Sequence, residues 1–182
     1  MLIKSPGQCI GYYKQPELTA ESFTPDGFFR TGDLGERTPE GLLKLTGRAK
    51  ELFKTAKGKY VAPAPIENLI NAHPMVELSL VSGVGQPAAH AMVVLAEHLR
   101  PRMKEAGLRE EVEKEMHALL ESVNASVADH EQLHMIVVKR EPWSVENGFL
   151  TPTMKVRRGR IEKSMEAHVD GWYATGRRVH WH

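Results

Sequence analysis

Apolar residues recur at helical spacing in two segments of the second half of the chain. The first segment carries such residues at Leu108, Val112, Met116, Leu119, Leu120 and Val123. The second shows the same spacing at Ile161, Met165, Val169 and Trp172. Stripes of this kind, with charged residues between them, predict two amphipathic helices that each bury one face. A shorter helix is predicted from Pro65, which a first helical turn tolerates, to a stop at His73-Pro74.

Continuous apolar runs predict three strands, at residues 76–84, 91–95 and 135–138. A β-hairpin is predicted where Leu52-Phe53-Lys54 and Tyr60-Val61 flank a polar turn at residues 56–59. From about residue 50 onward, strands therefore alternate with helices. This pattern predicts the α+β class: a small domain with a three-stranded sheet, helices packed on it and an added β-hairpin.

Residues 1–46 have a different character, because turn formers such as Pro25-Asp26-Gly27 and Pro39-Glu40-Gly41 interrupt them repeatedly. Two short strand-like runs, residues 28–31 and 42–46, are predicted to pair as a hairpin. A few short strands with so few large apolar residues cannot form a core alone. We therefore expect this β-rich segment to be the end of a sheet whose remainder lies elsewhere, and to be mobile or rearranged without it.

Composition places the chain among soluble globular proteins: of 182 residues, 26% are charged and 41% hydrophobic. The net charge of +1 gives no electrostatic reason to expect nucleic acid as a partner. The single cysteine, Cys9, excludes an intrachain disulfide and fits a reducing compartment. No apolar run approaches the ~20 residues of a membrane span, and no signal peptide is recognisable. We expect a cytoplasmic protein, with peripheral membrane contact left open.

Two clusters in the first third of the chain suggest contacts with an oxygen-rich ligand. Asp33 is presented between glycines, so its carboxylate can accept hydrogen bonds from a vicinal diol, as acidic residues do with ribose; the alternative is a turn cap. Arg48 offers a planar fork of donors. Lys50 lies in a polar connector, residues 47–50, where a hinge can absorb a backbone rotation; the alternative is a solvated linker.

A third cluster lies near the end of the chain, at residues 148–156. Pro152 stiffens this loop, so Lys155 follows on a restrained backbone and can place its charge beside a phosphate or a developing oxyanion. The alternative is a surface charge. The chain also has 9 scattered histidines. Those at the frayed end, His180-Trp181-His182, form at most a weak metal site.

The order and spacing of these clusters is more specific than any one of them. Thr-Gly-Asp at residues 31–33, Gly-Arg-Ala-Lys at 47–50, Gly-Lys-Tyr-Val-Ala-Pro at 58–63 and Leu-Thr-Pro-Thr-Met-Lys at 150–155 together resemble the adenylate-forming superfamily. Within it, residues 53–68 and 146–155 are most similar to long-chain fatty acyl-CoA synthetases. Other branches usually carry glycine where Met154 stands here.

The resemblance implies a role for each cluster. Asp33 would bind the ribose hydroxyls of ATP, and Arg48 would lie close to the same nucleotide. Lys155 would bridge the attacking carboxylate and the α-phosphate while acyl-adenylate forms. Lys50 would lie on the hinge about which the small domain turns before the second half-reaction. Lys57, Gly58 and Lys59 would then line the channel for the pantetheine of CoA.

The resemblance also implies a domain plan. Residues 1–46 would be the C-terminal remnant of a large adenylation domain, 47–50 the hinge, and 51–182 a mobile C-terminal domain. The cofactors and substrates would be ATP, CoA, a fatty acid and Mg²⁺, with the magnesium site in the large N-terminal domain. No Ser/Thr/Gly-rich phosphate loop ending in Lys is found in this sequence. We therefore expect this chain alone to be inactive as an acid–thiol ligase.

Two alternatives remain open from the sequence. The first is an adenylating enzyme that loads the thiol of a carrier protein instead of CoA. The second is a stand-alone, non-catalytic docking module that uses the same small domain. The unpartnered strands predicted in residues 1–46 argue against a stand-alone module.

Overall fold

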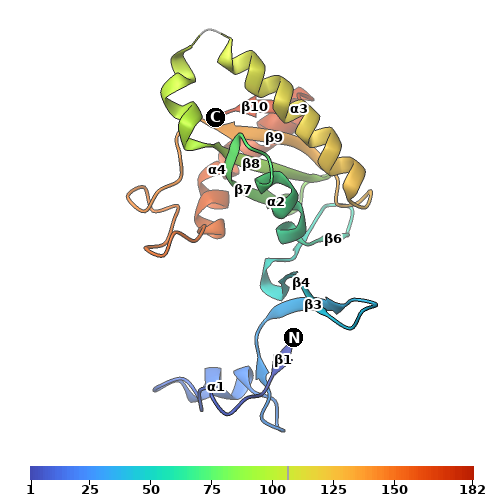
Figure 1. Cartoon of the computed structure of the whole chain (residues 1–182), viewed down its shortest axis with the longest axis vertical. Coiled ribbons are helices and arrows are strands. Elements are labelled where there is room, and N and C mark those ends of the chain that lie inside the picture. Colours follow the sequence, from blue (N-terminus) through green and yellow to red (C-terminus); the bar gives the residue numbers. More distant parts are fainter. Residues whose placement is uncertain (106) are drawn as a thin grey trace. The chain divides into compact units, whose positions relative to one another are not determined.

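The computed structural model describes residues 1–105 and 107–182, which divide into two compact units, Met1–Leu52 and Phe53–His182 (Figure 1). The α+β class predicted from the sequence is confirmed. None of the described helices is long and apolar enough to cross a membrane. Each unit is described by itself below.

The first unit consists of short elements. Strand β1 (Leu2–Ile3) pairs antiparallel with β2 (Phe29–Arg30), and β3 (Asp33–Arg37) pairs antiparallel with β4 (Leu43–Arg48). A short helix, α1 (Pro16–Ser22), lies between β1 and β2 in the sequence, and the 3-10 turn η1 (Ala49–Glu51) follows β4.

The pairing predicted for this unit was wrong. Residues 29–30 pair with the N-terminus, and the hairpin partner of 43–48 is Asp33–Arg37. The sequence Asp-Leu-Gly-Glu-Arg has no run of β-branched or aromatic residues, so its strand character was not visible. Its pairing comes from the turn, where Thr38 N donates to Leu42 O at 2.8 Å and Gly41 N to Thr38 O at 2.9 Å.

The first unit has no core of its own. None of its residues, all of which the structure describes, is buried. Leu42, Leu43 and Leu45 on the β3–β4 hairpin are 67%, 60% and 60% exposed. Several neighbouring leucines with this exposure are uncommon on the surface of a soluble protein. Such a patch typically marks a surface that packs against another protein segment.

The second unit is built on one mixed sheet in the order β10-β9-β8-β7. Strands β7 (Val76–Ser82) and β8 (Ala89–Leu95) are antiparallel, whereas β9 (Leu133–Lys139) is parallel to both β8 and β10 (Val179–Trp181). The predicted three strands are confirmed, but the sheet has a fourth. The prediction of a frayed C-terminus was wrong, because Val179 pairs with Ile136 and His180 is only 8% exposed. A strand of three residues is too short to show in a hydrophobic pattern.

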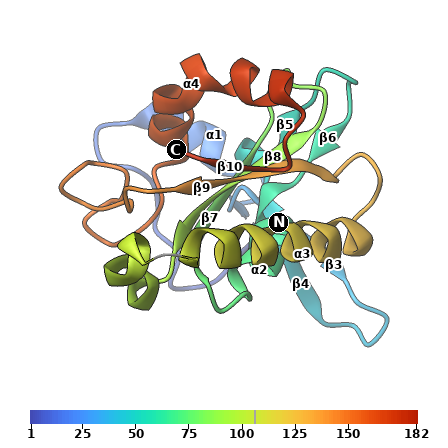
Figure 2. The same cartoon turned by 90° about the horizontal axis from the view of Figure 1, so that it is seen from above.

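Helices cover both faces of this sheet (Figure 2). On one face lie α2 (Pro63–Asn71) and α3 (Leu108–Ser126), and η2 (Glu97–Lys104) adds Leu99 to the same core. On the other face lies α4 (Arg158–Thr175), which packs Ile161, Met165 and Trp172 against the sheet. The three helices predicted from the sequence are confirmed. Their apolar stripes are the buried faces of these two core layers.

The predicted hairpin is also confirmed: β5 (Phe53–Lys54) pairs antiparallel with β6 (Tyr60–Val61). It leads directly into α2, which starts with Pro63 in its first turn. Phe53 and Val61 are buried in the same core as α2 and α3. The hairpin is therefore anchored at its base while its turn remains exposed.

Candidate functional site

Lys155 lies on a tightly closed loop. Leu150 and Val156 form an isolated antiparallel bridge at its base, and Leu150 is only 1% exposed. Across the loop, Thr151 N donates to Lys155 O at 2.8 Å and Lys155 N donates to Thr151 Oγ1 at 3.0 Å. Met154 N donates to Thr151 O at 2.8 Å. The backbone of this loop, residues 150–156, is thus fixed while the Lys155 side chain is exposed.

Met154, the residue before this lysine, has a left-handed backbone with φ of 61°. A residue with a Cβ atom pays roughly 1–2 kcal/mol to adopt this region, whereas glycine does not. The conformation gives a physical reason why a glycine is suited to this position. It also leaves local backbone strain next to Lys155, as functional loops commonly do.

The segment that leads into the loop is held by Asn147. Its side-chain oxygen accepts from Ser144 N at 2.9 Å and Phe149 N at 3.3 Å, and its amide nitrogen donates to Pro142 O at 2.9 Å. A single side chain thereby satisfies three backbone groups of an irregular segment. The loop that carries Lys155 is consequently supported from both of its ends, by Asn147 before it and by α4 after it.

The predicted CoA-channel residues form the turn of the β5–β6 hairpin. Gly58 has φ of 77°, and Gly58 N donates to Thr55 O at 2.9 Å, so the turn requires glycine there. Lys57 and Lys59 flank it with exposed side chains. The hairpin also packs on the turn between β7 and β8, residues 83–88: Ala56 N donates to Gln86 O at 2.9 Å, and Gly85 N to Lys54 O at 3.1 Å.

Asp33 and Arg48 are brought together in the first unit. They face each other across β3 and β4, and Arg48 Nε lies 3.3 Å from Asp33 Oδ1. The Asp33 side chain is 21% exposed and that of Arg48 62%. The arginine thus holds one carboxylate oxygen, which leaves the carboxylate oriented for a further donor. Lys50 follows within η1 and is exposed. Its role as a hinge stays a prediction.

The sequence-predicted residues therefore fall into two groups. Asp33, Arg48 and Lys50 belong to the first unit, whereas Lys155 and the hairpin turn belong to the second. Among the described residues no cluster of three or more His, Cys, Asp or Glu side chains is arranged to hold a metal ion.

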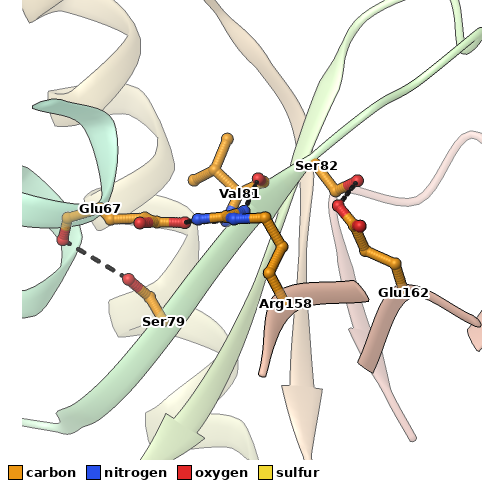
Figure 3. A network of polar contacts seen from close by, with 6 residues as sticks. All are labelled: Glu67, Ser79, Val81, Ser82, Arg158 and Glu162. Atoms are coloured by element: carbon orange, nitrogen blue, oxygen red, sulfur yellow. Dashed lines mark hydrogen bonds and ion pairs between the residues drawn. The ribbon is translucent and has the colours of Figure 1, made fainter. Parts of the chain in front are cut away.

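Sequence reasoning missed a polar network that links α2, β7 and α4 (Figure 3). Arg158 Nη1 donates to Val81 O at 2.7 Å, and Arg158 Nη2 lies 2.5 Å from Glu67 Oε1. Ser82 Oγ donates to Glu162 Oε1 at 2.7 Å. The members are far apart in the sequence, so no local pattern reveals their pairing.

It also missed a buried histidine. His90 on β8 is 2% exposed and stands next to the aromatic rings of Trp172 and Tyr173 from α4. Burial, with a smaller contribution from His134, lowers the pKa of His90 to about 4. Its neutral ring is therefore part of the core at neutral pH.

The comparison with curated proteins gives long-chain fatty acid ligases. The chain is 34% identical to "Long-chain-fatty-acid--CoA ligase 1" of Cavia porcellus over 95% of its own length and 27% of that protein. It is 30% identical to "Long-chain-fatty-acid--CoA ligase FadD15" of Mycobacterium tuberculosis over 95% of its length and 31% of that protein. The chain thus spans about a quarter to a third of the length of these relatives.

Among solved structures, the adenylation domain of a carboxylate reductase from Mycobacterium chelonae matches with a TM-score of 0.78 at 28% identity, covering 95% of this chain and 27% of that one. The adenylation and carrier-protein didomain of a carboxylic acid reductase from Segniliparus rugosus matches with a TM-score of 0.77 at 27% identity, covering 96% of this chain and 24% of that one. Residues 51–177 match the family described as "AMP-binding enzyme C-terminal domain". Because that match covers most of the chain, the chain belongs to the family of AMP-binding enzyme C-terminal domains.

Proposed function

We propose that this chain is the C-terminal part of an AMP-forming ligase that converts a long-chain fatty acid into its CoA thioester through an acyl-adenylate. The observation that carries the proposal is the identity of 34% with a long-chain fatty acid ligase, spread over 95% of this chain. The predicted functional residues lie inside that matched length. The chain covers only 27% of the relative, so the acyl pocket and the magnesium site are expected in the part outside it.

In the first half-reaction Lys155 supplies positive charge. The closed loop restricts its backbone, so the side chain starts from a fixed point on the domain. A charge supplied there stabilises the negative charge that builds on the α-phosphate and the attacking carboxylate in the transition state. Removal of one such contact typically costs about 3–4 kcal/mol in the barrier, or a factor of 10²–10³ in rate.

Asp33 and Arg48 would hold the nucleotide. With one carboxylate oxygen of Asp33 bound by Arg48, the other is available to accept from the ribose hydroxyls. The ion pair fixes the carboxylate before ATP arrives. This pre-organisation lowers the entropy lost on binding.

The hairpin turn would act in the second half-reaction. Its exposed Lys57 and Lys59 suit the phosphate groups of CoA, and Gly58 leaves room for a narrow pantetheine chain. Rotation about Lys50 would exchange the Lys155 loop for the hairpin at one reaction centre, which is gating by domain movement.

A second candidate is transfer of the acyl group to a carrier-protein thiol. It is favoured by the similarity to adenylation domains of carboxylic acid reductases, one of which is joined to its carrier protein in the solved structure, with TM-scores of 0.78 and 0.77. The two candidates share the first half-reaction and differ only in the acceptor.

The test replaces the matching segment of the guinea pig ligase with this chain and measures the two half-reactions separately. We expect Lys155→Ala to reduce pyrophosphate release about 100-fold or more, while thioester formation from supplied acyl-adenylate continues. Lys114→Ala, an exposed lysine on α3, is the matched control and should change neither. Unchanged half-reactions in Lys155→Ala would refute the role of Lys155.

Two further measurements test whether the isolated chain is active and which acceptor receives the acyl group. The isolated chain should release no pyrophosphate from ATP with a long-chain fatty acid, and robust turnover would contradict its being only a part of the enzyme. Offering CoA and a phosphopantetheinylated carrier protein in parallel distinguishes the two candidates, because the acceptor that is acylated faster identifies the reaction.

A further inference from the structure

Strand β7 lies at the edge of the sheet, where backbone groups have no neighbouring strand. At Val81, side chains occupy the place of that strand. Val81 N donates to Glu67 Oε1 at 2.7 Å, and Val81 O accepts from Arg158 Nη1 at 2.7 Å. Glu67 and Arg158 thus satisfy both the backbone donor and the backbone acceptor of one residue, as a paired strand would.

The two side chains also bind each other, with Arg158 Nη2 at 2.5 Å from Glu67 Oε1. Their exposed fractions are 15% for Glu67 and 21% for Arg158, so the pair is largely shielded from water. We call Glu67, Val81 and Arg158 the edge clamp. Figure 3 shows Glu67 reaching the strand from α2 and Arg158 reaching it from α4. Because these helices lie on opposite faces of the sheet, the clamp joins both layers around its edge.

The clamp occupies a particular place along the chain. Arg158 is the first residue of α4 and follows the Lys155 loop directly, whereas Glu67 belongs to α2, which follows the hairpin. A second route joins the hairpin itself to α4. The hairpin binds Gln86 O through Ala56 N at 2.9 Å, and Gln86 Nε2 donates to Asp170 of α4 at 3.0 Å. The hairpin is therefore linked to α4 through Gln86, in addition to the link between α2 and α4 that the edge clamp makes.

We propose that Glu67 and Arg158 are positioning residues that fix the Lys155 loop and the hairpin turn relative to each other. This inference rests on the proposed function, in which the loop serves the first half-reaction and the hairpin the second. A rotating domain delivers either group to the same reaction centre with accuracy only if their separation is constant. The clamp supplies that constancy by joining α4, which follows the loop, to α2, which follows the hairpin.

The geometry requires arginine at residue 158. Its two terminal nitrogens reach different acceptors, the carbonyl oxygen of Val81 and the carboxylate of Glu67. A lysine carries the same charge but offers a single nitrogen, so it cannot reproduce the planar fork. Arg158→Lys should therefore restore only part of what Arg158→Gln loses.

The first test measures amide hydrogen exchange in the full 182-residue chain for Arg158→Gln, Glu67→Gln and the double variant. We expect amides of the Lys155 loop and of the hairpin turn to exchange about tenfold faster in Arg158→Gln, while those in the middle of α3 stay unchanged. The double variant should add little to Arg158→Gln, because the two residues act through one pair. Arg157→Gln, an exposed neighbouring arginine, is the control. Two results would overturn the proposal: faster exchange throughout the domain, or an unchanged exchange rate in the loop and the hairpin.

The second test uses the fusion with the large domain of the guinea pig ligase. Arg158→Gln should reduce the rate constants of both half-reactions, by up to about 100-fold for a misplacement near 1 Å, with the KM for ATP unchanged. Arg158→Lys should recover part of both rates. Full activity of Arg158→Gln in an active fusion would refute the positioning role. An inactive parent fusion would instead contradict the proposed function, and the exchange measurement then decides on the clamp alone.

Discussion

Acidification should weaken the second unit through His90, whose surroundings hold the ring neutral. Tyr173 Oη donates to Ala88 O at 2.6 Å, so its oxygen accepts from His90 Nδ1 at 3.1 Å. His90 Nε2 then carries a lone pair and has no partner among the described residues. Protonation would place a charge in a buried aromatic cluster beside His134. Burial first, and His134 second, lower the pKa of His90 from its ordinary 6.5 to about 4.

The sign and size of the effect follow from this pKa. The unfolded chain binds a proton at His90 near pH 6.5, whereas the folded chain does so only near pH 4. The stabilisation is therefore complete above pH 6.5 and is lost as the pH falls toward 4. Since one pKa unit corresponds to about 1.4 kcal/mol, the free energy of unfolding should drop by about 2 kcal/mol between pH 7 and pH 4.5 from this residue alone.

The measurement is urea unfolding of the chain at several pH values, with parent, His90→Gln and His98→Gln compared. Glutamine keeps a donor for Tyr173 but does not titrate, so His90→Gln should lose about 2 kcal/mol less than the parent over this range. His98 is exposed, and its replacement should leave the pH dependence unchanged. Burial also lowers the pKa values of His180 and His182, and these groups remain in both proteins. Equal pH dependence in parent and His90→Gln would refute the reasoning.

Three further predictions concern the Lys155 loop and the β7–β8 turn on which the hairpin packs, each checked by urea unfolding. Met154→Gly should be neutral or stabilise by up to about 1 kcal/mol, because glycine relieves the left-handed φ of 61°, whereas Met154→Val should destabilise. Leu150→Ala should cost about 2–5 kcal/mol, since Leu150 is 1% exposed; a loss below 1 kcal/mol would show that the loop base is not part of the core. Gly83→Ala should cost about 1–3 kcal/mol, because a Cβ there would lie 2.9 Å from Ala88 O and 3.2 Å from the Phe53 ring. Gly85→Ala is the control: it has a positive φ but open space around it, so its cost measures backbone strain without a clash.

Local sequence patterns predicted some helices and hairpins and missed others, and each outcome has a physical reason. The stripe of α3 marks a helix that is packed on one side only, so its periodicity survives in the sequence. The β5–β6 hairpin was visible because its turn, with Gly58, is specified within a few residues. Strand β3 was missed because its residues lack strand propensity, and α1 because its seven residues bury no side chain.

The candidate site shows the same division. Lys155, Asp33 and Arg48 were chosen from their motifs and their roles stay predictions; the structure adds the geometry around them. It pairs Asp33 with Arg48 across two strands and closes the loop under Lys155. Neither feature follows from composition or periodicity.

The sequence by itself determined the α+β class and the membership of this chain among adenylate-forming proteins, and it located three clusters predicted to carry chemistry, because each depends on short motifs and local periodicity. Only the tertiary structure decided the fourth strand, the edge clamp and the buried state of His90. These features join residues such as Glu67 and Arg158, 91 positions apart. These features depend on burial and on hydrogen bonds that exist only when the sheet has formed, so no local pattern encodes them.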